Sequence, residues 1–145
     1  MSETAGRITI RCPSCAAWNR VDPARAAAQP KCGRCAAAIA LDRPLALDDA
    51  SFARTIAETD VPILVDFYAD WCAPCRMMAP AVDALAAGTR GRALVAKLDT
   101  EQAVATAQRY GIRGLPTVIV FERGTERTRQ TGAMPGPMLE RLLGV

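Results

Sequence analysis

The chain has 145 residues, a formal charge of +3 and no histidine. Its residues are 50% hydrophobic and 23% charged, which is typical of a protein that folds around a core and excludes disordered and fibrous classes. Without imidazole, Cys–His and Ser–His–Asp catalysis are excluded, and a zinc site must use thiolates or carboxylates. No basic run is interleaved with aromatic residues, so we expect no nucleic-acid partner.

The six cysteines need an explanation. Residues 1–10 lack the apolar core of a signal peptide, and no stretch approaches the ~20 apolar residues that span a bilayer. We therefore expect a cytoplasmic protein with no membrane contact, in a compartment that keeps ordinary thiols reduced. Cysteines in such a protein indicate metal binding or redox catalysis.

The first four cysteines form two CxxC pairs at the spacing C-x2-C-x16-C-x2-C, namely Cys12, Cys15, Cys32 and Cys35. Residues 11–41 hold few large apolar residues, so this segment needs a staple to fold. Each pair turns two thiolates toward one point, and the loop between the pairs closes a tetrahedron around one Zn²⁺. Gly33 suits a tight turn that requires a positive φ. Four protein ligands leave no position for water, which predicts a structural zinc; two disulfides, four free thiols or an iron site with the same ligands are the alternatives.

A short linker follows this segment. Pro44 disfavours helix at the residue before it, so residues 41–45 are interpreted as the linker. The sequence thus predicts a zinc-ribbon module over residues 1–43 and a second domain over residues 44–145.

The second domain alternates strand and helix patterns. Residues 63–69 are almost continuously apolar, as in a strand covered on both faces, with Asp66 as the exception. A helical pattern and a second apolar strand follow, which predicts a right-handed parallel crossover. One expected helix begins near residues 47–52, and three others span 72–87, 101–110 and 137–143. The expected strands span 63–69, 93–98 and 117–121, and a fourth follows a hairpin turn at 122–125. We expect an α/β domain on a mixed sheet.

Cys72 and Cys75 lie where the first of these strands gives way to a helix. The free N–H groups at a helix N-terminus stabilise a thiolate, so Cys72 is expected to be the exposed, attacking sulfur. Cys75, one turn further, is expected to be more buried and to resolve a mixed disulfide. Pro74 suits the first helical turn. A core cysteine pair or half of another metal site is the alternative, but a CxxC beside a βαβ pattern favours redox chemistry.

Three motifs in this half resemble the thioredoxin family: DFYADWCAPCRMMAP (66–80), VAKLD (95–99) and YGIRGLPT (110–117), followed by Gly132. The resemblance covers the chain from about residue 47 to its end. With the four-cysteine segment in front, the chain is similar to the zinc-binding second thioredoxins of bacteria. The resemblance implies a thioredoxin fold, with a mixed central sheet flanked by helices. It also implies a protein-disulfide reductase, protein disulfides as substrates, and regeneration by an NADPH-linked thioredoxin reductase.

The resemblance also implies roles for individual residues. Asp66 would relay the proton of the buried thiol, with Lys97 near it, and burial of this acid predicts a raised pKa; a hydrogen-bonded structural acid is the alternative. Pro116 would be a cis-proline, beside which the backbone of Leu115 pairs with an extended substrate, although a plain turn proline would fit the same sequence. The apolar docking surface would be shaped by Trp71, Ala73, Pro74, Gly114, Leu115, Gly132 and Ala133.

Two departures from the family pattern leave the reduction potential open. Ala73 stands where glycine is most familiar, between the two cysteines, and Tyr68 stands where tryptophan is common.

An alternative function is a redox-regulated chaperone or oxidative-stress sensor, in which oxidation of the four-cysteine site expels zinc. A third is a ribbon that docks a protein partner. No feature demands more than a monomer.

Overall fold

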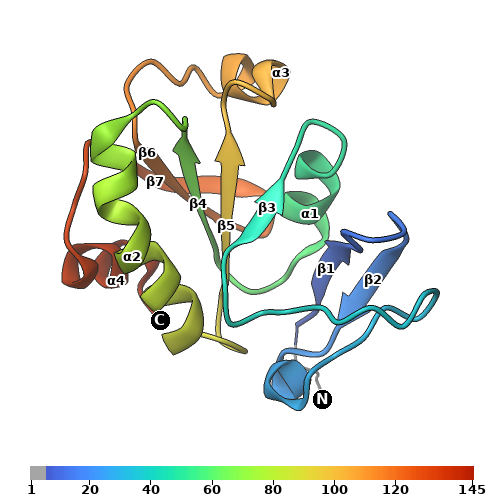
Figure 1. Cartoon of the computed structure of the whole chain (residues 1–145). Coiled ribbons are helices and arrows are strands. Elements are labelled where there is room, and N and C mark those ends of the chain that lie inside the picture. The colour runs from blue at the N-terminus through green and yellow to red at the C-terminus, as the bar shows by residue number, and fades with distance from the viewer. Residues whose placement is uncertain (1–5) are drawn as a thin grey trace.

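The computed structural model describes residues 6–145. The stretch that we expect not to be a signal peptide, residues 1–10, lies partly outside the described residues, at residues 1–5. Within 6–145 the chain forms a two-stranded sheet and a five-stranded sheet (Figure 1). The small antiparallel sheet pairs β1 (Ile8–Arg11) with β2 (Trp18–Val21), and the 3-10 helix η1 (Pro23–Ala28) follows it. Cys12 and Cys15 lie between the two strands, and Cys32 and Cys35 follow η1.

The large sheet has the strand order β3-β5-β4-β6-β7. Strands β3, β5 and β4 are parallel, whereas β6 and β7 are antiparallel to their neighbours, so the expected mixed sheet is confirmed. Its elements are β3 (Leu45–Leu47), α1 (Phe52–Glu58), β4 (Ile63–Tyr68), α2 (Ala73–Gly88), β5 (Leu94–Asp99), α3 (Val104–Arg109), β6 (Thr117–Glu122), β7 (Thr125–Thr131) and α4 (Gly136–Leu143).

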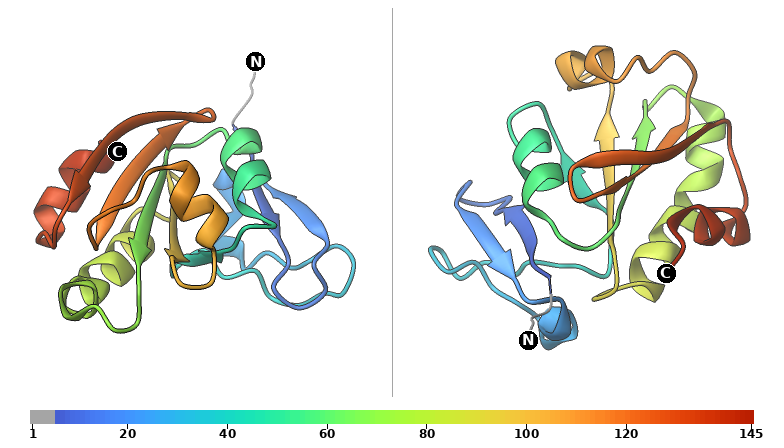
Figure 2. Two further views of the ribbon diagram at one scale, coloured as in Figure 1. Left: turned by 90° about the horizontal axis from the view of Figure 1, so that it is seen from above. Right: turned by 180° about the vertical axis from the view of Figure 1, so that it is seen from behind.

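Helices cover both faces of the large sheet (Figure 2). Along β4, Val65 and Phe67 pack with Phe52 of α1 on one face. Leu64 points the other way and packs with Met78 of α2 and with Leu139 of α4. This alternation is the reason why the strand is apolar at nearly every position, because both of its faces are buried.

The segment interpreted as a linker is partly a strand. Leu45–Leu47 pairs in parallel with Ala96–Leu98 of β5 and forms one edge of the sheet. A three-residue strand carries too little periodicity to be recognised, and Pro44 is tolerated because it precedes an edge strand. Helix α1 therefore begins only at Phe52, after a turn in which the side chains of Asp48 and Ser51 each accept the other's backbone N–H.

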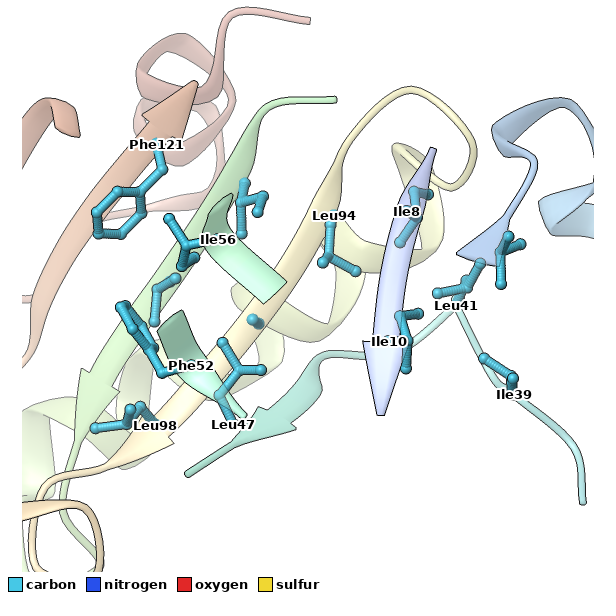
Figure 3. Packing of buried hydrophobic residues seen from close by; sticks show 14 of the residues in the cluster. Ile8, Ile10, Ile39, Leu41, Leu47, Phe52, Ile56, Leu94, Leu98 and Phe121 are labelled. Atoms are coloured by element: carbon cyan, nitrogen blue, oxygen red, sulfur yellow. The ribbon is translucent and has the colours of Figure 1, made fainter. Parts of the chain in front are cut away.

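The ribbon packs directly on the second domain beside α1. Asp60 donates its N–H to the carbonyl of Arg7 at 2.8 Å, and the Thr9 hydroxyl donates to the carbonyl of Glu58 at 2.7 Å. Ile8 and Ile10 belong to the same buried cluster as the α1 and β5 residues (Figure 3). The ribbon thus shares a core with the second domain. This shared core stabilises the ribbon in addition to any cross-link that its cysteines provide.

Within residues 6–145, no helix combines the length and the apolar character that crossing a bilayer requires.

Candidate active site and metal centre

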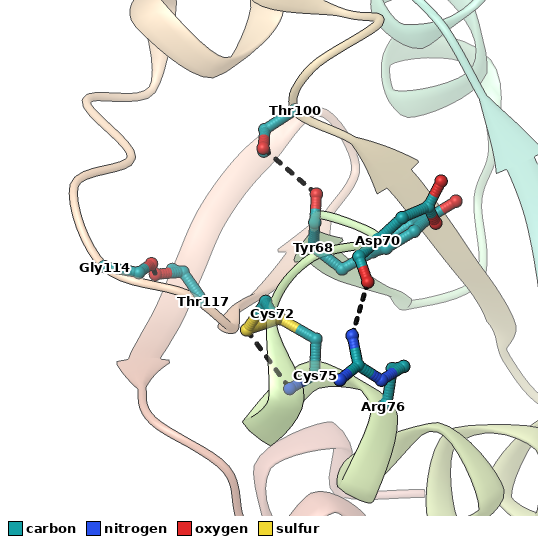
Figure 4. The surroundings of a disulfide bond; sticks show 8 residues. All are labelled: Tyr68, Asp70, Cys72, Cys75, Arg76, Thr100, Gly114 and Thr117. Atoms are coloured by element: carbon teal, nitrogen blue, oxygen red, sulfur yellow. Dashed lines mark hydrogen bonds between the residues drawn. A yellow bond between two sulfur atoms is a disulfide. The ribbon is translucent and has the colours of Figure 1, made fainter.

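Cys72 lies at the N-cap of α2 and forms a disulfide with Cys75, with the two Cα atoms 5.3 Å apart. The Cys72 Sγ accepts the backbone N–H of Cys75 at 3.2 Å (Figure 4). Pro74 occupies the first turn of the helix, as expected. The Cys72 sulfur therefore sits at the N-terminal end of a sixteen-residue helix, where free N–H groups stabilise a thiolate.

The expected difference in exposure between the two sulfurs is not found in this disulfide form. Cys72 and Cys75 are each 4% exposed, because Tyr68 and Leu115 pack against the pair. Trp71, next to Cys72 in the chain, is 67% exposed. Sequence position alone could not predict this cover, since Leu115 comes from a distant loop.

Two hydrogen bonds that the sequence did not predict hold the loop before α2. The Arg76 guanidinium donates to the carbonyl of Asp70 at 2.6 Å, and the Thr100 hydroxyl donates to the carbonyl of Tyr68 at 3.0 Å (Figure 4). Both acceptors are backbone carbonyls, one at the end of β4 and one just after it. The loop carrying Trp71 and Cys72 is thereby tied to α2 and to the end of β5.

Asp66 is buried behind the cysteine pair. It is 4% exposed, and its Oδ1 has no hydrogen-bond partner among the described residues. Burial raises the pKa of this carboxyl to about 7, and the charge of Lys97, its register partner on β5, opposes the rise. Asp66, Lys97 and Cys75 line one cavity of about 180 Å³. A carboxyl that titrates near neutral pH beside a thiol is suited to proton transfer.

The loop before β6 faces the cysteine pair. The Leu115–Pro116 peptide bond is cis, as the resemblance implies. Gly132 donates its N–H to the carbonyl of Pro116 at 2.8 Å, and the Thr117 hydroxyl donates to the carbonyl of Gly114 at 2.6 Å. These bonds fix the backbone beside Cys72.

The predicted docking residues lie around this loop and at the start of α2. Ala73 and Pro74 are exposed on the first turn of the helix, and Ala133 is exposed after β7. Leu115 and Gly132 are half-buried. Met77, which sequence reasoning did not place among these residues, is 79% exposed on α2, one turn after Ala73 and Pro74.

The four N-terminal cysteines converge, with all four Sγ atoms within 4.8 Å of one another. Two contacts between the pairs, Cys12–Cys35 and Cys15–Cys32, are 3.6 Å long. A tetrahedron with Zn–S bonds of about 2.3 Å has sulfur–sulfur edges of about 3.8 Å. The cysteines therefore fit a single tetrahedral ion.

Gly33 does not have the predicted role. The positive φ in each CxxC turn falls on the residue after the second cysteine, at Ala16 (φ 65°) and Ala36 (φ 64°). The turn continues one residue beyond the pair, where the N–H of the alanine bonds to the carbonyl of the first cysteine. Gly33 instead donates its N–H to the Asn19 side chain.

The surroundings of the sulfurs act on them unequally. The backbone N–H of Cys35, the Asn19 side chain and the N–H of Arg34 lower the pKa of the Cys32 thiol to about 6. For Cys35 the Ala37 N–H lowers the pKa of the thiol, but burial and the neighbouring cysteine sulfurs outweigh it and raise this pKa to about 11. Cys12 and Cys32 are buried, whereas Cys35 is exposed. Soft thiolate ligands in a tetrahedral arrangement are typical of zinc or iron–sulfur sites.

Two family models match the chain. The model described as Thioredoxin matches residues 43–143, and the model described as Thioredoxin 2, N-terminal, which represents a zinc ribbon, matches residues 11–37.

Individual relatives agree with these matches. Thioredoxin C-3 of Corynebacterium nephridii is 37% identical over 127 residues, which cover 88% of this chain and 87% of the relative. Thioredoxin 1 of Nostoc sp. is 41% identical over 95 residues, or 66% of this chain and 89% of the relative. The solved structure of a mutant thioredoxin from Halobacterium salinarum NRC-1 superimposes with a TM-score of 0.66 at 35% identity, covering 72% of this chain and 91% of that one. The chain therefore belongs to the thioredoxin family of disulfide oxidoreductases and carries a thioredoxin 2-type ribbon at its N-terminal end.

Proposed function

We propose that this chain reduces disulfide bonds in cytosolic proteins. The Cys72 thiolate attacks a substrate disulfide, forms a mixed disulfide and releases one substrate thiolate. Cys75 then attacks the Cys72 sulfur, which releases the second substrate thiolate and leaves the Cys72–Cys75 disulfide. The two electrons come from the dithiol, and NADPH-linked thioredoxin reductase returns them.

The observation that carries this proposal is the shared cavity of Asp66 and Cys75. The Asp66 carboxyl has a pKa of about 7, and its Oδ1 lacks a hydrogen-bond partner among the described residues. In the proposed cycle the Asp66 carboxylate, which the charge of Lys97 favours, takes the proton of Cys75. Asp66 becomes the neutral acid, and Cys75 becomes the nucleophilic thiolate.

Substrate recognition is assigned to the surface around Cys72. An extended substrate segment pairs with the backbone at Leu115, beside Pro116, in the manner of strand addition. Exposed apolar side chains supply the contacts for side chains of the substrate, namely Trp71, Ala73, Pro74 and Ala133, and the half-buried Gly132 adds backbone surface beside them.

The metal is assigned as one structural Zn²⁺ held by Cys12, Cys15, Cys32 and Cys35. The sulfur spacing supports a tetrahedral ion, and four protein ligands leave no position for substrate. We place the boundary between the ribbon and the thioredoxin domain at residues 43 and 44, and we infer a monomer in the cytoplasm, with neither nucleic acid nor a membrane as partner.

A second candidate function is a sensor that releases zinc on oxidation. The exposure of Cys35 favours it, because this thiolate is open to oxidants. Mild peroxide should then release zinc before insulin-reducing activity is lost. Zinc retained throughout would argue against a sensor.

The test of the preferred function is insulin reduction by a matched pair of variants. Cys72→Ser should abolish activity and form no substrate adduct. Cys75→Ser should also lose turnover, but should accumulate a mixed disulfide at Cys72, visible by mass spectrometry. Activity retained by Cys72→Ser would overturn the proposal. A reduction potential well above that of the cytosolic glutathione pool would favour an oxidant or isomerase.

A further inference from the structure

The two CxxC turns of the metal centre are hydrogen-bonded in the same way. In the first, the Cys12 N–H donates to the carbonyl of Ala17 at 2.7 Å, and the Ser14 N–H donates to the Cys12 Sγ at 3.4 Å. In the second, twenty residues later, Cys32 N–H donates to Ala37 at 2.8 Å and Arg34 N–H donates to the Cys32 Sγ at 3.4 Å. The backbone hydrogen bonds are therefore the same in the two CxxC turns.

Asn19 on β2 breaks this symmetry. Its Nδ2 donates to the Cys32 Sγ at 3.4 Å and to the carbonyl of Ala17 at 3.2 Å, and its Oδ1 accepts the N–H of Gly33 at 2.9 Å. One amide thus bonds the backbone of the first turn and both the backbone and the sulfur of the second. The residue twenty positions later is Ile39, a buried apolar side chain, so the second turn offers no such amide in return.

The four sulfurs are consequently not equivalent. The Cys32 sulfur accepts the Arg34 N–H, as the Cys12 sulfur accepts that of Ser14, and it accepts the Asn19 amide in addition. Hydrogen bonds from outer partners orient a metal ligand and lower the tendency of its sulfur to react or protonate. Asn19 is also held in place, because β2 pairs it with Ile10 in the ribbon sheet.

We propose that Asn19 is a positioning residue of the metal centre, whose amide clamps the second CxxC turn to the first and thereby slows loss of the metal. The inference rests on the zinc site proposed above and adds a residue outside the CxxC motifs. It assigns two separable tasks: Oδ1 orients the second turn through Gly33, and Nδ2 stabilises the Cys32 thiolate.

Two substitutions separate these tasks in the full chain. Asn19→Ala removes both hydrogen-bonding groups. Asn19→Asp keeps an oxygen for Gly33 but places a carboxylate oxygen against the Cys32 sulfur where the donor was. Ser14→Ala is the matched control, since it truncates a side chain beside the first turn and leaves the N–H to Cys12 in place.

The first measurement is the zinc content of each protein, followed by the rate of zinc transfer to the chromophoric chelator 4-(2-pyridylazo)resorcinol. Asn19→Ala should lose zinc about tenfold faster than the parent chain, the lower end of the usual effect of an outer partner. Asn19→Asp should lose it at least as fast, and Ser14→Ala at the parent rate. Insulin reduction, which depends on Cys72 and Cys75, reports whether each variant is still folded.

A spectroscopic measurement distinguishes loss of the hydrogen bond to the Cys32 sulfur from a general loosening of the metal centre. With ¹¹³Cd in the site, the cadmium resonance should move in both Asn19 variants and stay in place in Ser14→Ala. A parent chain with no zinc would overturn the zinc site and this inference together. One zinc per parent chain with an unchanged rate in Asn19→Ala would overturn the inference alone. Parent-like retention in Asn19→Asp would overturn the role of Nδ2.

Discussion

Asp49 caps helix α3 from a position 57 residues before Thr106 in the chain. Its Oδ1 accepts the backbone N–H of Thr106 at 2.8 Å and the Thr106 hydroxyl at 2.6 Å. These two bonds satisfy donors in the first turn of α3, where a backbone N–H has no partner within the helix. They also tie the turn before α1 to the helix that leads into the Pro116 loop.

Removing this cap should destabilise the protein in a pH-dependent way. The hydroxyl and then the N–H of Thr106 lower the pKa of Asp49 in the folded chain. A lowered carboxyl pKa stabilises the fold above the unfolded value, and this contribution is lost as the pH falls through the folded value. Asp49→Ala should therefore lower the urea midpoint at pH 7, and the difference from the parent should shrink below about pH 4. A constant difference across that range would contradict the cap.

Asp66 should destabilise the fold at neutral pH. Its pKa of about 7 lies above the unfolded value of about 3.9, so the folded state binds more protons between these pH values. Stability therefore falls as the pH rises from about 4 to 7. Asp66→Asn should be more stable by up to about 4 kcal/mol at pH 8, since each pKa unit corresponds to about 1.4 kcal/mol.

Urea unfolding of the oxidised protein at several pH values measures this gain. The advantage of Asp66→Asn should decline toward pH 4. Asp83→Asn, which alters an exposed carboxyl on α2, is the control and should show no comparable gain. Equal stability of parent and Asp66→Asn at pH 8 would contradict the burial of a charged carboxylate.

Metal removal should affect the thioredoxin domain as well as the ribbon. Cys12, Ile10 and Phe52 belong to one buried cluster, and Thr9 bonds the end of α1. Chelation should lower the melting temperature of the whole chain, because binding to the folded state alone adds to stability. Hydrogen exchange at Asp60, which bonds the carbonyl of Arg7, should become faster. Calorimetry that shows an unchanged transition for the domain, with only the ribbon unfolded, would contradict this coupling.

Position 114 should require glycine, because a side chain there would collide with Thr131. A Cβ on Gly114 would lie 2.8 Å from Thr131 Cγ2, and the Thr131 hydroxyl is held 3.1 Å from that of Thr117. Gly114→Ala should displace the loop beside Cys72 and reduce kcat/KM for insulin by roughly tenfold to a hundredfold. Adding Thr131→Ser removes the clashing methyl and keeps the hydroxyl, so the double variant should recover most of the activity. Failure of this rescue would show that the clash is not the cause.

Much of the architecture was predictable from local patterns. The apolar run that became β4 and the helical pattern that begins at Cys72 are correct to within one or two residues. The four clustered sulfurs follow from CxxC spacing, because each turn is built from adjacent residues. By contrast, β3 was missed, since three residues become a strand only when β5 lies beside them.

The sequence by itself determined the α/β class, the two groups of cysteines and the place of Cys72 at a helix N-terminus, because each depends on residues within a few positions of one another. Tertiary structure decided which distant groups meet: Asn19 with Cys32, Asp49 with Thr106, and Ile10 of the ribbon with the core beside α1. It also decided that Cys72 is covered by Leu115 and that Ala16 and Ala36, and not Gly33, adopt the left-handed conformation. The physical reason is that periodicity and spacing report only local geometry, whereas burial and hydrogen bonding depend on segments brought together when the whole chain folds.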